Sequence, residues 1–124
     1  MTDRVLRIGI AGMVNDHVWF MADSTHALKN AKLVSAADPH AELTQRAAER
    51  YGVSTYASYE EMLDREQLDA VMVCSDNAEK VRIVSAAAQR GLHCYVDKPM
   101  SATLAQANEM VAVARRAGIK VMIA

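Results

Sequence analysis

Short runs of apolar residues alternate along the chain with longer stretches in which apolar residues recur at helical spacing. The run 70–74 contains no polar residue, which is typical of a strand covered on both faces in a parallel sheet. The stretch 16–29 shows the other pattern and predicts an amphipathic helix. Its apolar stripe consists of Val18, Met21, Ala22, Thr25 and Leu28.

These two patterns continue to the end of the chain. Strands are expected at 5–10, 32–37, 55–56, 69–75, 92–97 and 121–124, and helices at 16–29, 39–51, 58–63, 77–90 and 104–117. Pro39 is expected in the first turn of its helix, and Ser58 and Thr103 open capping boxes. Three helices end at the glycines Gly52, Gly91 and Gly118. Alternating strands and helices predict an α/β fold with a doubly wound parallel sheet of strand order 3-2-1-4-5-6.

Composition narrows the class of protein. The 124 residues suffice for one domain, and the net charge of -1 gives no electrostatic case for nucleic acid or an acidic membrane. No apolar run could span a bilayer and residues 1–7 lack a signal-peptide pattern, so a cytoplasmic protein is expected. The terminal strand has no closing helix after it, which predicts that residues 1–124 form the first domain of a longer protein.

The cysteine, histidine and aromatic residues do not predict a disulfide, a catalytic nucleophile or a metal site. Cys74 and Cys94 could face each other across the sheet, but reduced, buried thiols are the expected state. Trp19 and Phe20 are expected to be packing residues at the start of their helix. No nucleophile arrangement is present. No metal site is predicted, because no metal-ligand spacing links the four histidines, His17, His26, His40 and His93.

The turn after the first strand is where a dinucleotide pyrophosphate would rest on a helix N-terminus. Gly12 fills the first position of the G-x-G-x-x-G template, but Val14 and His17 occupy the second and third. A branched side chain at the second position hinders close approach of the backbone to phosphate. Alternatively, Gly12 serves only a tight turn, with Asn15 or Asp16 as an ordinary N-cap. The pyrophosphate-binding segment is predicted as Gly12, Met13, Val14 and Asn15.

Asp38 ends the second strand, 26 positions after Gly12, where an acid accepts the adenosine ribose hydroxyls. Its charge would repel a 2′-phosphate, and Pro39 and His40 supply no arginine to bind one. NAD is therefore predicted over NADP. The alternative is that Asp38 only caps the helix that starts at Pro39.

Two further segments fall on the same sheet edge. Ser75, Asp76 and Asn77 follow the fourth strand and could border the nicotinamide, although Asp76 or Asn77 could equally cap the next helix. Lys98 stands between Asp97 and Pro99 at the tip of a buried strand. A lysine there could bind a substrate hydroxyl and assist proton transfer, whereas the alternative is an ordinary solvated lysine. Asp97 and Lys98 are predicted site residues, with Lys98 catalytic.

Several segments together resemble the N-terminal domain of the Gfo/Idh/MocA oxidoreductases along essentially the whole chain. The resemblance rests on the first strand and turn at 8–12, the second strand at 33–38, and the segments 59–63, 68–73 and 91–103. The last is the most specific, because Asp97-Lys98-Pro99 is similar to the Glu-Lys-Pro signature of the family. The departures are Val14 and His17 in the first turn, Asp76 and Lys80 after the fourth strand, and Asp97 in the signature.

This resemblance implies a Rossmann domain that binds NAD or NADP. It also implies hydride transfer to or from a hydroxyl-bearing carbon of a sugar, inositol or related polyol, with Lys98 contacting substrate and cofactor. The remaining catalytic groups, and commonly the interface of a homo-oligomer, would belong to a second domain that is absent from this chain. The 124 residues alone are expected to be inactive. Two alternatives remain open: a non-catalytic Rossmann-like domain that has lost cofactor binding, and an enzyme with an unrelated substrate.

Overall fold

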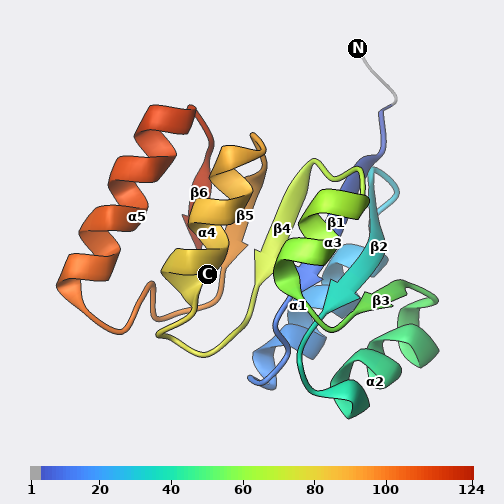
Figure 1. The fold of residues 1–124 in the computed structure, drawn as a ribbon. Helices are drawn as coiled ribbons and strands as arrows, with labels where there is room; N and C mark the ends of the chain where they lie inside the picture. Colours follow the sequence, from blue (N-terminus) through green and yellow to red (C-terminus); the bar gives the residue numbers. More distant parts are fainter. Residues whose placement is uncertain (1–3) are drawn as a thin grey trace.

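The computed structural model describes residues 4–124 (Figure 1). The strands are β1 (Leu6–Ala11), β2 (Ala31–Ala37), β3 (Ser54–Tyr56), β4 (Ala70–Val73), β5 (His93–Val96) and β6 (Val121–Ile123). The helices are α1 (His17–His26), α2 (Ala41–Tyr51), α3 (Tyr59–Arg65), α4 (Lys80–Gln89) and α5 (Leu104–Ala117). Every helix thus lies between two strands, as the alternating sequence pattern predicts.

The strands form a six-stranded sheet in the order β3-β2-β1-β4-β5-β6, and all neighbouring pairs are parallel. The predicted strand order is confirmed. The chain runs outward from β1 to β3, then returns to place β4 on the other side of β1. The connections after β1 and β4 therefore leave the sheet on opposite sides. That reversal opens a crevice beyond the carboxyl ends of the strands.

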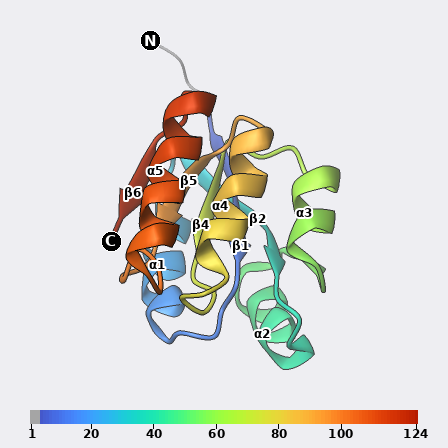
Figure 2. The same ribbon diagram turned by 60° about the vertical axis from the view of Figure 1, so that its left-hand side comes forward.

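Each face of the sheet carries its own apolar core. On one face, α1 and α2 cover strand residues that include Ile10, Leu33 and Met72. On the other face, α3, α4 and α5 cover residues that include Val71 and Val73. Figures 1 and 2 show α4 and α5 lying side by side on that second face. Alternate residues of β4 enter opposite cores, which explains why its sequence is apolar without interruption.

Helix boundaries differ from the prediction at several ends, and α3 continues to Arg65 rather than ending at residue 63. The first helix ends at His26 rather than residue 29, and Leu28 is exposed beyond it. Pro39 lies outside the second helix, because His40 is its N-cap. The fourth helix begins at Lys80, since residues 77–79 form a turn in which the Asp76 carboxylate accepts a hydrogen bond from the Glu79 N–H at 3.1 Å. Helical periodicity alone does not locate such polar turns at helix ends.

Adjacent aromatic residues of α1 have opposite environments. Trp19 is buried, with the Arg46 guanidinium 4.1 Å from its ring centroid. Phe20 is 77% exposed, so the expectation that it packs in the core is wrong. Successive helical residues point about 100° apart, and the core-facing stripe passes through Val18, Trp19 and Met21 but not Phe20.

The predicted helix caps are present. The Ser58 hydroxyl accepts a hydrogen bond from the Glu61 N–H at 3.3 Å, and the Thr103 hydroxyl accepts one from the Gln106 N–H at 3.1 Å. The Gln106 side chain reaches back to the Ala102 N–H at 3.1 Å. These bonds satisfy N–H groups that the first helical turn leaves without an intrahelical partner.

The two thiols are buried and free, as expected for reduced cysteines. Cys74 belongs to the core beneath α1 and α2, whereas Cys94 belongs to the core beneath α3, α4 and α5. They therefore do not face each other. Burial raises the pKa of each thiol to about 12. Among residues 4–124, no helix is long and apolar enough to cross a membrane.

Alkaline pH should destabilise the fold through these thiols. The folded state retains their protons after the unfolded chain has lost them, so unfolding free energy falls as pH rises from about 9 toward about 12. The loss should approach about 1 kcal/mol per thiol per pH unit. Urea unfolding between about pH 8 and about pH 10 measures it. A Cys74→Ala/Cys94→Ala variant retains the tyrosines and lysines that also titrate there, and should show a shallower pH slope. Equal slopes would contradict the prediction.

Candidate functional site

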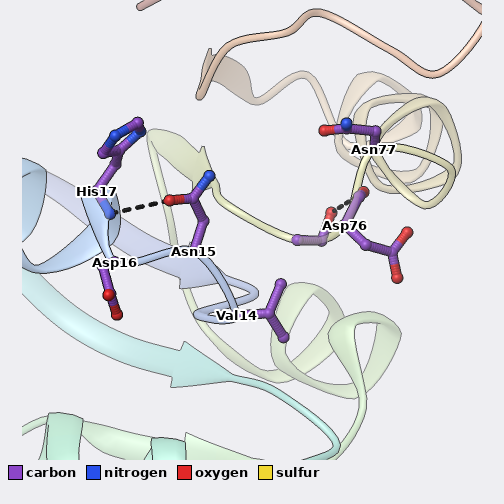
Figure 3. Close-up of a pocket in the computed structure, with 7 residues that line it drawn as sticks. Val14, Asn15, Asp16, His17, Asp76 and Asn77 are labelled. Atoms are coloured by element: carbon purple, nitrogen blue, oxygen red, sulfur yellow. Dashed lines mark hydrogen bonds between the residues drawn. The ribbon is translucent and has the colours of Figure 1, made fainter.

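The loops that follow β1 and β4 line an open cavity of about 560 Å³ at the carboxyl edge of the sheet (Figure 3). Its lining residues are Val14, Asn15, Asp16, His17, Ser75, Asp76 and Asn77. The structure thus brings the predicted pyrophosphate-binding turn together with the predicted nicotinamide-side loop. Two carboxylic acids and one histidine are the ionisable residues of this lining.

Gly12 allows the loops after β1 and β4 to approach closely. Its φ is +88°, a conformation that favours glycine, and a Cβ atom there would lie 2.5 Å from the backbone of Ser75. The glycine is therefore required by contact with the protein's own chain. This supports the tight-turn interpretation of Gly12, while the same turn places the N-terminus of α1 at the cavity.

Backbone N–H groups at the start of α1 differ in their availability. The Met13 N–H donates to the Asp38 carboxylate at 2.8 Å, so it is already paired. The Asn15 side chain accepts a hydrogen bond from the His17 N–H at 3.1 Å, whereas Asp16, at the N-cap position, makes no side-chain cap bond. Within residues 4–124, the N–H groups of Val14, Asn15 and Asp16 have no acceptor. These three groups could donate to an anion.

Asp38 is buried at the end of β2, and its carboxylate contacts both the turn after β1 and the residue before α2. One carboxylate oxygen accepts from the Met13 N–H. The other lies 2.8 Å from the His40 backbone nitrogen and 2.7 Å from the His40 ring nitrogen Nδ1. Asp38 is not the helix N-cap, a position held by His40. The half-exposed His40 ring covers the carboxylate, a contact that the sequence did not indicate.

Asp97, at the end of β5, is only 2% exposed. Its Oδ1 lies 3.4 Å from Nδ1 of His17, and its Oδ2 is buried without a partner among the described residues. Buried carboxylate oxygens normally accept hydrogen bonds, so an unpaired one indicates a position where a further donor could bind. The segment Asp97-Lys98-Pro99 is therefore in contact with His17, the first residue of α1.

Lys80 is the functional-site residue that sequence reasoning passed over. Although it is a lysine, it is 1% exposed. Its ammonium donates to the backbone oxygens of Asp97 and Pro99, both at 2.7 Å, and to the Asn77 side-chain oxygen at 3.0 Å. Burial lowers its pKa, and the Asp97 carboxylate opposes that shift. The one signal in the sequence is that Lys80 departs from the family pattern at this position.

Lys98 is exposed at the same edge, which agrees both with its predicted role and with the alternative of an ordinary solvated lysine. It borders a second cavity of about 260 Å³, lined by His17, Phe20, Met21, Tyr95, Asp97, Lys98 and Ala124. Among residues 4–124, His17 is the one residue that lines both cavities. The exposed Phe20 ring gives this second cavity an apolar wall, next to a cation that could contact a polar ligand.

The loop after β4 has local roles as well as lining the larger cavity. The Ser75 hydroxyl donates to the Asp76 carbonyl at 3.2 Å, and Asp76 closes the turn before α4. Asn77 holds the Lys80 ammonium. The alternative interpretation of Asp76 as a residue that stabilises the helix start is thus supported, without removing it from the cavity. In the described part of the chain, no group of three or more histidine, cysteine, aspartate or glutamate residues is placed to hold a metal ion.

Residues 4–124 match the family model Gfo/Idh/MocA, described as "Oxidoreductase family, NAD-binding Rossmann fold". The chain is 32% identical to D-apiose dehydrogenase of Paraburkholderia graminis over 109 residues, which are 85% of this chain and 29% of that enzyme. It is 26% identical to myo-inositol 2-dehydrogenase of Thermotoga maritima over 115 residues, 92% of this chain and 34% of that enzyme. The chain thus spans about a third of the length of these relatives.

Solved structures agree with the sequence relatives. The WlbA dehydrogenase from Bordetella pertussis, determined in complex with NADH and UDP-GlcNAcA, superposes with a TM-score of 0.89 at 26% identity. The match covers 100% of this chain and 36% of that one. It therefore includes every element from β1 to β6.

Replacing Lys80 by methionine should destabilise the fold by about 2–4 kcal/mol, because the buried carbonyl of Asp97 and the part-buried carbonyl of Pro99 lose a charged donor. Urea unfolding followed by circular dichroism measures the change. Lys29→Met, at an exposed lysine, is the matched control and should change stability by less than about 0.5 kcal/mol. Equal effects of the two substitutions would show that Lys80 does not hold the two loops together.

Proposed function

Because this chain belongs to the Gfo/Idh/MocA oxidoreductase family, we propose that it is the cofactor-binding domain of a nicotinamide-dependent dehydrogenase or reductase. The substrate would be a sugar, an inositol or a related polyol, since relatives include D-apiose and myo-inositol dehydrogenases. The observation that carries the proposal is the meeting of Asp38, the N-terminus of α1 and Lys98 at one sheet edge.

The described residues fit a dinucleotide. The unpaired N–H groups of Val14 and Asn15 lie at the α1 N-terminus, where the helix dipole favours a diphosphate. Asp38 would hold the adenosine ribose, provided that the His40 ring shares or yields the oxygen it contacts. A bound nicotinamide supplies the hydride donor or acceptor. Ser75, Asp76 and Asn77 would border its pocket, and the buried free oxygen of Asp97 would accept a ligand hydroxyl.

Lys98 would act on the substrate side. Its ammonium can donate a hydrogen bond to a substrate oxygen, which steadies negative charge on that oxygen and orients the reacting carbon. The adjoining Phe20 and Tyr95 would exclude water from one side of this pocket. The rest of the catalytic machinery would come from a second domain, which we also propose to form the interface of a homo-oligomer. The buried free thiols are in keeping with a cytoplasmic location.

NADH should bind the 124-residue chain more tightly than NADPH. The Asp38 carboxylate would repel a 2′-phosphate by about 1 kcal/mol, or roughly fivefold in affinity. Calorimetric titration with both cofactors measures the ratio of the NADH affinity to the NADPH affinity. The substitution Asp38→Asn should lower this ratio toward one. Circular dichroism establishes that each sample is folded. A folded chain that binds neither cofactor at about 1 mM would contradict the proposal and favour a non-catalytic domain.

Lys98→Ala, made in a longer parent chain that includes the second domain, should lower kcat by at least about 100-fold. The affinity for NADH should change by less than about threefold, because the lysine lies on the substrate side. Steady-state rates with a panel of polyols and cofactor titration give the two values. Lys29→Ala is the matched control at an exposed lysine distant in sequence from the site loops. Loss of cofactor affinity alone would show that Lys98 does not have the proposed role.

A further inference from the structure

His17 occupies a position where the missing third glycine of the fingerprint would be, and the structure gives it a defined environment. It is the first residue of α1 and lines both cavities at the sheet edge. Its backbone N–H is held by the Asn15 side chain. The imidazole is therefore presented from a fixed point between the pyrophosphate-side and substrate-side cavities.

The Asp97 carboxylate orients the His17 ring. Its Oδ1 lies 3.4 Å from Nδ1 of the imidazole, and the His17 side chain is 54% exposed. Because Nδ1 faces Asp97, the ring nitrogen left for a ligand is Nε2. A carboxylate that faces one nitrogen of a histidine helps to fix the orientation of the ring. Asp97 is itself fixed, since the Lys80 ammonium binds its backbone oxygen.

His17 differs in charge from the other ionisable residues of the larger cavity. Of the residues that line the larger cavity, His17 is the one whose side chain can become positive, whereas Asp16 and Asp76 are acids. The Val14 side chain hinders the close backbone approach that a second glycine would permit. A diphosphate at this cavity would therefore need a cation to offset the two carboxylates. His17 is the residue in place to supply it.

We propose that His17 is a ligand of the cofactor diphosphate, with Nε2–H of the protonated imidazole donating to a phosphate oxygen. Together with the free N–H groups of Val14 and Asn15, it would replace the glycine-rich contacts that this chain lacks. This inference rests on the proposed function, because it assigns one contact within the proposed cofactor site. The histidine at the third position of the glycine template would then bind the anion through its side chain, where the template uses close backbone contacts.

Affinity for the diphosphate should then depend on pH. The titratable and charged groups that line the two cavities with His17 are Asp16, Asp76, Asp97, Lys98, Tyr95 and, in the 124-residue chain, the terminal carboxyl group of Ala124; Lys80 lies behind Asp97. Carboxyl groups, lysines and tyrosines ordinarily keep their charge state between about pH 6 and about pH 8, where histidines change theirs. A diphosphate ligand favours the protonated imidazole. Binding should therefore strengthen as pH falls through this range.

Titration calorimetry with ADP-ribose tests the inference on the 124-residue chain, since this probe carries the diphosphate without the nicotinamide. The wild type should bind about three- to tenfold more tightly at about pH 6 than at about pH 8. His17→Gln should bind at both pH values with the weaker affinity, whereas His17→Lys should restore tight binding without the pH dependence. His26→Gln, at the other end of the same helix, is the control and should behave as wild type.

Adenosine, which lacks phosphate, separates a contact to the diphosphate from a general distortion of the site. Its binding should not change in His17→Gln. Equal ADP-ribose affinities of wild type and His17→Gln, or equal weakening of adenosine, would overturn the inference while leaving the proposed function intact. If His17→Gln does not fold, the pH dependence of ADP-ribose affinity is compared between the wild type and His17→Lys. Equal pH dependence of the two proteins would overturn the inference. Failure of the wild type to bind either NADH or ADP-ribose would overturn the proposed function itself.

Discussion

One buried ammonium group fixes the geometry of the candidate site. The Lys80 side chain is 1% exposed, and its three N–H donors each meet an oxygen: the bond to Asp97 is buried, and those to Asn77 and Pro99 are part-buried. One acceptor lies after β4, and the other two lie after β5. A charged group with all its donors paired is stable when it is buried, but removing it leaves its acceptors unsatisfied. The two loops are therefore held together by a lysine whose three donors all bond to oxygens of the chain itself.

The positions of the other site residues follow from that anchor. With its backbone oxygen held, Asp97 keeps its carboxylate beneath the surface, where one oxygen faces His17 and the other remains unpaired. Lys98, the next residue, is turned outward to the second cavity. On the other half of the sheet, Asp38 ties the turn after β1 to the start of α2. Two buried carboxylates thus position the turn between β1 and α1 from opposite sides.

The sequence predicted the fold well because its signals are local or periodic. Uninterrupted apolar runs, glycine stops and the caps at Ser58 and Thr103 each report on a few neighbouring residues, and the parallel order follows from general rules of connection. The environments of Lys80 and His40 depend instead on residues distant in space or on the course of a turn. Residue type suggests that a lysine is solvated, so its burial could not be read from the chain. Phe20 shows the converse, because its exposure depends on which side of α1 the sheet lies.

Glycine fingerprints are read as evidence for phosphate binding, yet Gly12 is required here by a contact within the protein. A side chain at that position would collide with Ser75 whether or not a ligand binds. The remaining template positions describe one way to bring a backbone close to a diphosphate, which is not the same as the capacity to bind one. A diphosphate can also be bound by free N–H groups at the start of a helix, together with a cation that offsets nearby carboxylates and a rigid support for that cation. In the binding mode proposed for this chain, Asp97 and Lys80 would provide the support, which links the departures from the family pattern at Val14, His17 and Lys80.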